Sequence, residues 1–239
     1  MKIFRFKQFG IRQDHAAMKV GTDSDLLGAL ARGGDTVLDI GSGTGVLALM
    51  MAQRFENAHI EAVEIDEGAV VDARFNFEAS PWGGRIALVH SSFQDYVVSH
   101  GQARKFDSVV CNPPFFQPGD RCGSDSRNVA RHCDTLPFGV LAEGVALLLA
   151  DEGWFSVILP ADVSRRFDVE CAFNGLWLCE RFEIHTIEGR PSKRHVSVYG
   201  RTRIDDPRVE KVFLRNSEGG WSDWFENLME PFLLYMPKP

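Results

Sequence analysis

Cysteine is scarce in this chain, and its spacing follows no binding pattern. Only five of the 239 residues are cysteines, and no two of them are separated by two residues. An odd, scattered set predicts neither a disulfide framework nor a zinc site, so we expect no bound metal. Cysteines used in this way are typical of the reduced thiols of a cytoplasmic protein.

Long apolar runs are also missing. No segment approaches the run of about eighteen apolar residues that predicts a membrane-spanning helix. The basic N-terminus, with Lys2, Arg5 and Lys7, is not followed by the apolar segment of a signal peptide. We therefore expect no membrane contact and a cytoplasmic location.

A basic excess is absent as well. The formal net charge is −7, which argues against a protein that coats nucleic acid generally. A nucleic-acid substrate is still allowed, because binding requires only a local basic surface. The sequence has no internal repeat, low-complexity segment or linker. We therefore expect residues 1–239 to form one domain, with no obligate protein partner.

The most informative stretch lies where an apolar strand, residues 106–111, stops at Asn112 and two prolines. Successive prolines cannot continue a strand, so they stiffen the backbone just beyond the sheet edge. The Asn112 side chain and the Pro113 carbonyl can both accept hydrogen bonds from one planar amino group. Phe115, and with it Phe116, can stack on the flat system that carries the amine, typically worth ~1–3 kcal/mol per base. A strand-terminating turn with a core aromatic is the alternative for this motif alone.

A second candidate site follows the strand at residues 36–40. Gly41, Gly43 and Gly45 alternate between this strand and an apolar helical segment. Glycine lets the backbone turn sharply and approach a ligand closely. The spacing differs from the G-x-G-x-x-G of dinucleotide sites, and the Lys-Ser/Thr of a phosphate-binding loop is missing. The pattern therefore favours a ligand without a diphosphate.

An acidic residue, Glu64, ends the strand at residues 59–64. It lies about twenty residues beyond the glycines, where an acid accepts both hydroxyls of a ribose. We assign the capping of the next helix to Asp66, although Glu64 could serve that helix N-terminus instead. A ribose-binding acid without a diphosphate loop, beside an amine-accepting motif, points to S-adenosylmethionine. Its sulfonium is already an activated methyl donor, so the chemistry requires no metal.

Strand and helix patterns alternate as far as residue 159, and an antiparallel pair follows. The predicted strands cover residues 36–40, 59–64, 86–90, 106–111 and 154–159, then 176–187 paired with 195–204, and a short strand at 209–214. Helices are predicted from Thr22 or Asp23 to the Gly33-Gly34 pair, from Asp66, over 136–150 and over 221–229. This order predicts an α/β doubly wound, mostly parallel sheet with an antiparallel end. Ligands on such sheets bind at the carboxyl ends of the strands, so the glycines, Glu64 and Asn112 are expected around one crevice.

Further motifs carry a resemblance to a known family. In chain order they are Phe4-Arg5-Phe6-Lys7-Gln8-Phe9, Lys19-Val20-Gly21-Thr22-Asp23, Leu38-Asp39-Ile40-Gly41, Ala62-Val63-Glu64-Ile65-Asp66, Asn112-Pro113-Pro114-Phe115-Phe116 and Phe232-Leu233-Leu234-Tyr235. From end to end the chain resembles the class I, Rossmann-like S-adenosylmethionine-dependent methyltransferases. Among them it is similar to bacterial enzymes that methylate the adenine beside the anticodon of a valine tRNA. The resemblance implies a class I methyltransferase fold and methyl transfer to N6 of adenine 37 in tRNA.

The resemblance also implies which residues hold the cofactor. They are Lys19, Thr22, Asp39, Gly41, Gly43, Gly45, Glu64, Ile65, Ser92, Phe93 and Asn112. Ile65 would pack on the adenine of the cofactor, while Lys19 and Thr22 would close over its methionine end. The family often has an acid after the third strand that binds the adenine amino group. Here Ser92 stands at that position, so its hydroxyl, the Phe93 backbone or Asp95 would supply the contact.

Three segments are candidates for contact with RNA. The polar loop within residues 112–132 contains Arg127 and Arg131, which suit phosphate contacts, although a solvated surface loop is the alternative. The basic hairpin tip with Lys193 and Arg194 suits a phosphate backbone, yet many hairpin tips are simply charged. The basic N-terminal arm, residues 1–20, fits equally an edge ribbon protected by charge.

The residues alone leave other activities open. The same amine-accepting motif serves methylation of guanine N2 in rRNA, of adenine in DNA, or of a glutamine amide in a protein. A non-catalytic RNA-binding factor on a methyltransferase fold is a further alternative. The presence of Asn112, Glu64 and the glycines argues against this last alternative. The lack of a separate target-recognition domain argues against a DNA substrate.

Overall fold

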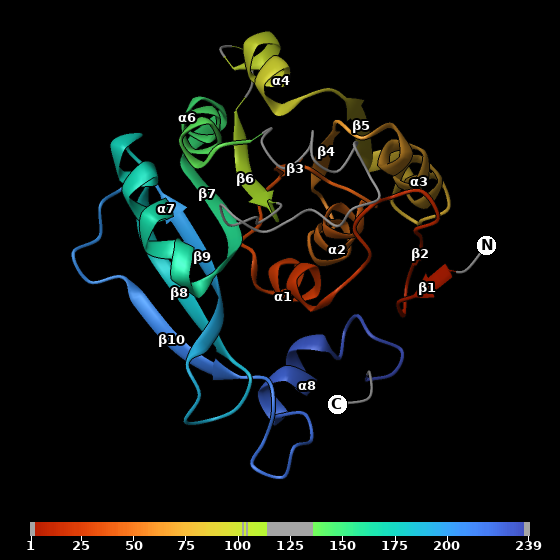
Figure 1. Ribbon diagram of the computed structural model, residues 1–239. Coiled ribbons are helices and arrows are strands. Elements are labelled where there is room, and N and C mark those ends of the chain that lie inside the picture. Colours follow the sequence, from red (N-terminus) through yellow and green to blue (C-terminus); the bar gives the residue numbers. More distant parts are fainter. Residues whose placement is uncertain (1–2, 102, 104, 114–135, 237–239) are drawn as a thin grey trace, which may run out of the picture.

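The computed structural model describes residues 3–101, 103, 105–113 and 136–236, and within them one large sheet organises the fold (Figure 1). Its eight described strands lie in the order β10-β8-β9-β7-β6-β3-β4-β5. They are β3 (Thr36–Ile40), β4 (His59–Glu64), β5 (Ile86–His90), β6 (Phe106–Cys111), β7 (Leu149–Pro160), β8 (Trp177–His185), β9 (Ser192–Gly200) and β10 (Arg208–Phe213).

The sheet is parallel from β7 through β6, β3 and β4 to β5. β9 runs antiparallel to both of its neighbours, β7 and β8. The predicted α/β architecture, mostly parallel with an antiparallel hairpin near one end, is therefore confirmed. β10 extends the sheet further by pairing in parallel with β8.

Helices cover both faces of the sheet. They are α1 (Thr22–Leu30), α2 (Val46–Arg54), α3 (Glu67–Glu78), α4 (Phe93–His100), α6 (Phe138–Leu148), α7 (Ala161–Phe173) and α8 (Asp223–Met229), with a short 3₁₀ turn, η1 (Gly83–Arg85). α1, α2, α3 and α8 share one hydrophobic core, which includes Met51 and Phe77. α4, α6 and α7 share the other, which includes Phe155 and Phe167. Figure 1 shows α1 and α2 separated from α6 and α7 by the central strands.

Several element ends differ from the sequence predictions. α1 is capped by Gly21 rather than by Thr22 or Asp23, because the Ser24 hydroxyl and the Gly21 backbone bond to each other. The same helix ends at Leu30, before the Gly33-Gly34 pair. The predicted helix over 136–150 ends at Leu148, since the next two residues already belong to β7.

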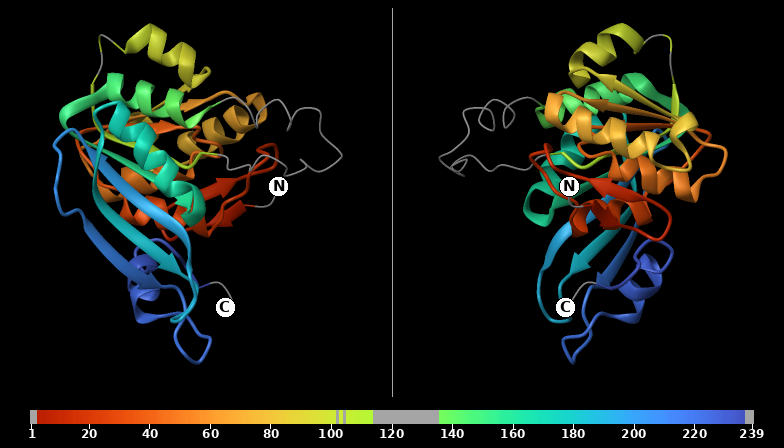
Figure 2. Two further views of the ribbon diagram at one scale, coloured as in Figure 1. Left: turned by 60° about the vertical axis from the view of Figure 1, so that its left-hand side comes forward. Right: turned by 90° about the vertical axis from the view of Figure 1, so that its right-hand side faces the viewer.

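The two ends of the described chain lie against each other. β1 (Ile3–Arg5) and β2 (Gly10–Arg12) form a separate antiparallel hairpin within residues 1–20. Phe6 bridges to Leu233, and the Lys7 N–H donates to the Phe232 carbonyl at 2.7 Å. Figure 2 shows this red hairpin and the blue C-terminal segment on the side away from α4 and α6.

None of the helices in the described part of the chain has the length and apolar character needed to cross a membrane.

Candidate active site

A cavity of about 410 Å³ opens at the carboxyl ends of β3, β4 and β6. Its size lies within the range of roughly 300–1,000 Å³ that is usual for small-molecule sites. The residues around it are Ala16, Ala17, Met18, Lys19, Ser24, Ile40, Gly41, Ser42, Gly43, Thr44, Val46, Leu47, Val63, Glu64, Ile65, Asp66, Ala69, Ser91, Phe93, Gln94, Asn112 and Leu136. The position matches the expected one, because ligands of open α/β sheets bind beyond the carboxyl ends of strands.

The glycine loop after β3 forms the floor of this cavity. Gly41, Gly43 and Gly45 have φ angles of 67°, 56° and 80°, a left-handed conformation that other residues rarely adopt. A Cβ on Gly41 or Gly43 would meet no atom within 4 Å, so both face open space. A Cβ on Gly45 would lie 2.3 Å from the Phe77 ring, so that glycine is required for packing between the loop and α3. Gly45 itself does not line the cavity.

Glu64, at the end of β4, is held by backbone amides. Its carboxylate accepts hydrogen bonds from Gly43 N–H at 2.7 Å, Ile65 N–H at 2.8 Å and Asp66 N–H at 2.7 Å. Asp66 caps α3, accepting from Ala69 N–H at 2.8 Å, as the sequence predicted. Glu64 is therefore fixed in place on the cavity wall, and it can accept further hydrogen bonds from a ligand.

Beneath the glycine loop lies a buried acid. Asp39 is fully buried and accepts a hydrogen bond from Ala48 N–H at 3.1 Å, while its second oxygen has no partner among the described residues. Burial raises the pKa of Asp39 to about 7. The hydrogen bond from Ala48 lowers this pKa, and the negative charge of the nearby Glu64 raises it. The buried Ser42 hydroxyl, on the cavity wall, also lacks a protein partner. Ser42 can therefore bind a polar group of a ligand directly, whereas Asp39 does not line the cavity.

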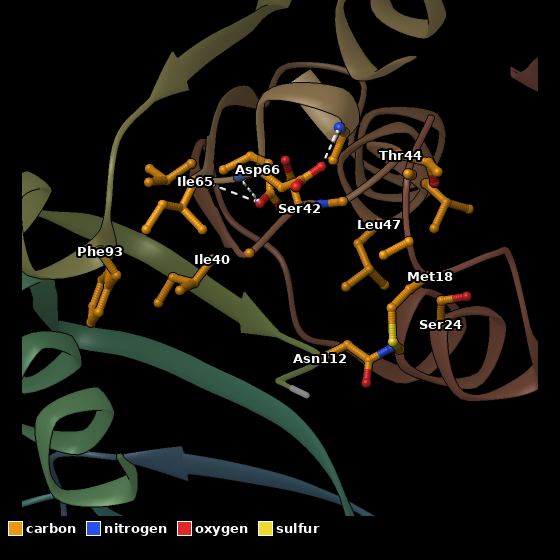
Figure 3. A pocket seen from close by; sticks show the side chains of 18 of the residues that line it. Met18, Ser24, Ile40, Ser42, Thr44, Leu47, Ile65, Asp66, Phe93 and Asn112 are labelled. Atoms are coloured by element: carbon orange, nitrogen blue, oxygen red, sulfur yellow. Dashed lines mark hydrogen bonds between the residues drawn. The ribbon is translucent and has the colours of Figure 1, made fainter. Parts of the chain in front are cut away.

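One end of the cavity is apolar. Figure 3 shows Ile65 and Phe93 at this end, with Asn112 and Met18 at the other. The Ile65 side chain is 42% exposed although it is apolar, so it offers a free surface on which a flat ring can pack. Ser92 does not line the cavity: its hydroxyl accepts from Asp95 N–H at 3.0 Å and caps α4.

The segment before α1 closes the other side. Lys19 lines the cavity, and its ammonium group donates to the carbonyls of Gln13 and Ala16. Thr22 is exposed and does not line the cavity; Ser24, the third residue of α1, lines it instead. Of the two residues that the resemblance implied here, Lys19 lines the cavity and Thr22 does not.

Asn112 follows β6 and lines the cavity, half-buried, and Pro113 after it is buried. Cys111, the last residue of β6, is buried, and burial, with Asp39 and Glu64 nearby, raises the pKa of its thiol. That thiol is therefore a packing group rather than a nucleophile. The other predicted residues of this motif and its loop lie outside the described residues: Phe115, Phe116, Arg127 and Arg131.

The predicted hairpin contact lies at the same edge of the sheet. Lys193 and Arg194 lie near the start of β9 rather than at the hairpin tip, and Arg194 is in register with Pro160 at the carboxyl end of β7. Lys193 is exposed. The Arg194 guanidinium donates to Asp23 at the start of α1, with an N···O distance of 2.8 Å. Arg194 thus ties the hairpin to the helix that follows Lys19.

Sequence reasoning missed two buried side chains on α3, Asp72 and Asn76. Neither lines the cavity, but both bind the segment that does. The signal for them was present: two polar residues one helical turn apart, on the face that also carries Ala69, Ala73 and Phe77. Polar residues on such a face are typical of a buried hydrogen-bonding role.

The fold and the cavity define a methyltransferase of the class that uses S-adenosylmethionine. Residues 16–130 match the family model for the methyltransferase small domain. A predicted O-methyltransferase from Agrobacterium tumefaciens has a similar fold, with a TM-score of 0.64 and 18% identity over 90% of this chain and 98% of that one. Fibrillarin from Aeropyrum pernix, solved with bound S-adenosyl-L-methionine, gives a TM-score of 0.51 and 14% identity, covering 74% and 72% of the two chains.

Relatives at higher identity narrow the class to one family. The chain is 42% identical to a tRNA1(Val) (adenine(37)-N6)-methyltransferase from Phocaeicola vulgatus over 98% of both chains. It is 39% identical to a protein of the same name from Klebsiella pneumoniae, covering 98% of this chain and 95% of that one. The chain therefore belongs to the tRNA1(Val) (adenine(37)-N6)-methyltransferase family.

Proposed function

We propose that this protein transfers the methyl group of S-adenosylmethionine to the exocyclic N6 of adenine 37 in tRNA1(Val). The observation that carries the proposal is full-length similarity: relatives that share this name are 37–42% identical over 97–98% of the chain. The cavity supports the proposal, because its lining residues suit each part of the methyl donor and Asn112 lies at one end of it.

We assign the contacts with the methyl donor to residues in and around the cavity. Glu64, fixed by three backbone amides, accepts the ribose hydroxyls. Ile65 and Phe93 pack against the adenine. The Ser42 hydroxyl and the Lys19 ammonium, both on the cavity wall, suit the ammonium and carboxylate of the methionine end, and the buried Asp39 lies beneath them. Acids near a cationic sulfonium also favour binding electrostatically.

Asn112 and Pro113 act on the substrate amine. When bound, S-adenosylmethionine supplies a methyl group on an activated sulfonium. The Asn112 side-chain oxygen and the Pro113 carbonyl accept the two N–H bonds of adenine N6, which draws its lone pair out of the ring. The amine nitrogen then bonds to the methyl carbon as the carbon–sulfur bond breaks, leaving S-adenosylhomocysteine. The extra proton passes to water, so the protein contributes positioning and electrostatics.

We assign the stacking of the target base to Phe115 and Phe116. We assign contacts with the RNA backbone to Arg127, Arg131, Lys193 and Arg194. Adenine must leave the stack of the anticodon loop to reach Asn112. Extrusion costs a few kcal/mol and is least for a base that is already unpaired.

We also propose that the enzyme acts in the cytoplasm, as a single domain, without a metal or a protein partner.

The test is transfer of a labelled methyl group to an unmodified tRNA1(Val) transcript by the purified protein. The matched control is the same transcript with guanine at position 37. We expect label in the first transcript only, and an unchanged rate in the presence of EDTA. Label in an rRNA fragment, a DNA duplex or a protein, with none in tRNA1(Val), would assign another planar amine. Normal cofactor binding without any transfer would favour a non-catalytic RNA-binding factor.

A further inference from the structure

Two buried polar side chains on α3 connect separate walls of the cofactor cavity. Asp72 and Asn76 lie one turn apart, and both are fully buried, with exposures of 0% and 1%. Neither lines the cavity. Buried polar groups are retained where every hydrogen bond is satisfied, so their partners indicate what they hold in place.

Asn76 joins the N-terminal segment to the glycine loop. Its side-chain oxygen accepts from Arg12 N–H at 2.7 Å. Its amide nitrogen donates to the carbonyls of Arg12 and Thr44, each at 2.9 Å. Thr44 lies between Gly43 and Gly45 and lines the cavity. A primary amide supplies one acceptor and two donors, and here all three functions are used.

Asp72 holds the next residues of the same segment. One oxygen accepts from the backbone N–H groups of His15 at 2.7 Å and Ala16 at 2.9 Å. The other lies 2.8 Å from Arg12 Nε and 3.0 Å from His15 Nδ1. Burial alone would raise the pKa of Asp72, but the bonds from His15, Ala16 and Arg12 outweigh it and hold the pKa well below its usual range. Asp72 is therefore a charged anchor.

The anchored segment leads directly into the cavity wall. Ala16, which Asp72 binds, lines the cavity, and so do the next three residues, 17–19. The segment is closed on itself, because the Gln13 side-chain oxygen accepts from Val20 N–H at 2.9 Å and the Gln13 backbone carbonyl accepts from the Lys19 ammonium. Figure 1 shows β2 beside α3, so the attachment to α3 fixes where this closed loop lies.

We propose that Asp72 and Asn76 are positioning residues for the cofactor, holding residues 12–16 and the glycine loop at a fixed separation. The inference rests on the proposed function in that the ligand is S-adenosylmethionine or its product. The cofactor contacts neither side chain. It binds to two walls whose relative position these side chains determine, so their removal weakens cofactor binding and leaves RNA binding unchanged.

Asn76→Ala removes both links at once. Because the buried hydrogen bonds that join the two walls are broken, we expect the Kd for S-adenosylhomocysteine to rise about tenfold, equivalent to about 1.4 kcal/mol. Asp72→Asn keeps an acceptor oxygen for the backbone of residues 15 and 16, so we expect a smaller rise. The inference therefore predicts that the Kd for S-adenosylhomocysteine is highest in Asn76→Ala, lower in Asp72→Asn and lowest in the wild type.

Asp168→Asn provides the matched control for a structural effect. Asp168, on α7 beyond the other face of the sheet, accepts from Arg181 at 2.6 Å and from Tyr199 at 2.7 Å. Its replacement disturbs a comparable polar network away from the cavity. We expect it to lower the melting temperature without changing the Kd for S-adenosylhomocysteine.

The experiment is calorimetric titration of the folded variants with S-adenosylhomocysteine, alongside RNA binding and hydrogen exchange. We expect Asn76→Ala to bind tRNA normally, to bind S-adenosylhomocysteine weakly, and to lose ligand-induced protection of amides in residues 12–19. Wild-type affinity and protection in this variant, with only a lower melting temperature, would overturn the inference. Because titration requires no RNA, a failure to methylate tRNA by the wild type would overturn the proposed function separately.

Discussion

The Gly43 N–H donates to the Glu64 carboxylate at 2.7 Å, so the acid assigned to the ribose also fixes the glycine loop. Two further amides, those of Ile65 and Asp66, bind the same carboxylate. The carboxylate is therefore oriented before any ligand arrives, and binding does not have to fix its rotamer.

Glu64→Gln is expected to weaken cofactor binding strongly. The glutamine nitrogen cannot accept from an N–H group, so either the loop contact or the ribose contact is lost. At ~1–3 kcal/mol per broken contact, we expect the Kd for S-adenosylhomocysteine to rise about 5- to 150-fold. Calorimetric titration measures this, and Glu67→Gln at the exposed start of α3 is the control. Unchanged affinity in Glu64→Gln would contradict the ribose assignment.

Ile65→Ala is expected to weaken the adenine end of the site. The side chain is 42% exposed in the absence of ligand, so its removal should cost little stability. Loss of apolar contact with a flat ring is worth ~1–2 kcal/mol, or about a 5- to 30-fold rise in Kd. The matched control is Val98→Ala on α4, an exposed apolar residue (87%) outside the cavity. Equal effects of the two substitutions would place the adenine elsewhere.

Lys193→Ala is expected to weaken tRNA binding and leave cofactor affinity unchanged. If Lys193 neutralises one phosphate, the slope of log K against log salt falls in magnitude by about 0.7–0.9. Arg194→Ala should have a mixed effect, because it also breaks the contact with Asp23. Arg166→Ala, exposed on α7, is the control. A salt slope that stays at the wild-type value in Lys193→Ala would exclude the hairpin from the RNA surface.

Asp25 predicts how stability depends on pH. It is buried on α1, one of its side-chain oxygens has no partner in the described part of the chain, and burial raises its pKa from 3.8 to about 7. Between these values the folded state keeps a proton that the unfolded state has lost. The free energy of unfolding attributable to Asp25 therefore falls as the pH rises from 4 to 7, and is constant above that range.

Asp25→Asn should remove this dependence. At about 1.4 kcal/mol per pKa unit, its advantage over wild type grows by up to about 4 kcal/mol between pH 4 and pH 8. Denaturant unfolding at both pH values measures the difference. Asp35→Asn provides a less buried acid for comparison. Parallel stability curves for wild type and Asp25→Asn would show that Asp25 ionises normally.

The central strands and the glycine loop could be predicted because local pattern determines them. The strand at residues 36–40 is apolar and runs straight into Gly41, Gly43 and Gly45, and the structure has β3 over the same residues. Asp66 is a sufficient cap by its own chemistry, and the structure uses it as one. Both features depend on neighbours in the chain.

The sequence predictions differ from the structure where the role of a residue depends on segments that are distant in the chain. Ser92 follows a strand and precedes an amphipathic run, so the sequence alone fits both a ligand contact and a helix cap; the structure uses its hydroxyl to cap α4. Asp72 and Asn76 could be recognised as polar residues on a buried face, but their role depends on the N-terminal segment crossing α3. The parallel pairing of β10 with β8 is likewise a long-range choice.

The most direct test of the account is mass spectrometry of tRNA1(Val) from cells that lack this gene and carry either wild-type protein or Asn112→Ala. The account predicts N6-methyladenosine at position 37 with the wild-type protein and unmodified adenine with Asn112→Ala. The purified variant should still bind S-adenosylhomocysteine measurably, so that its loss of modification reflects the substrate amine rather than an absent cofactor. Full modification by Asn112→Ala, or methylation at another position in the wild type, would contradict it.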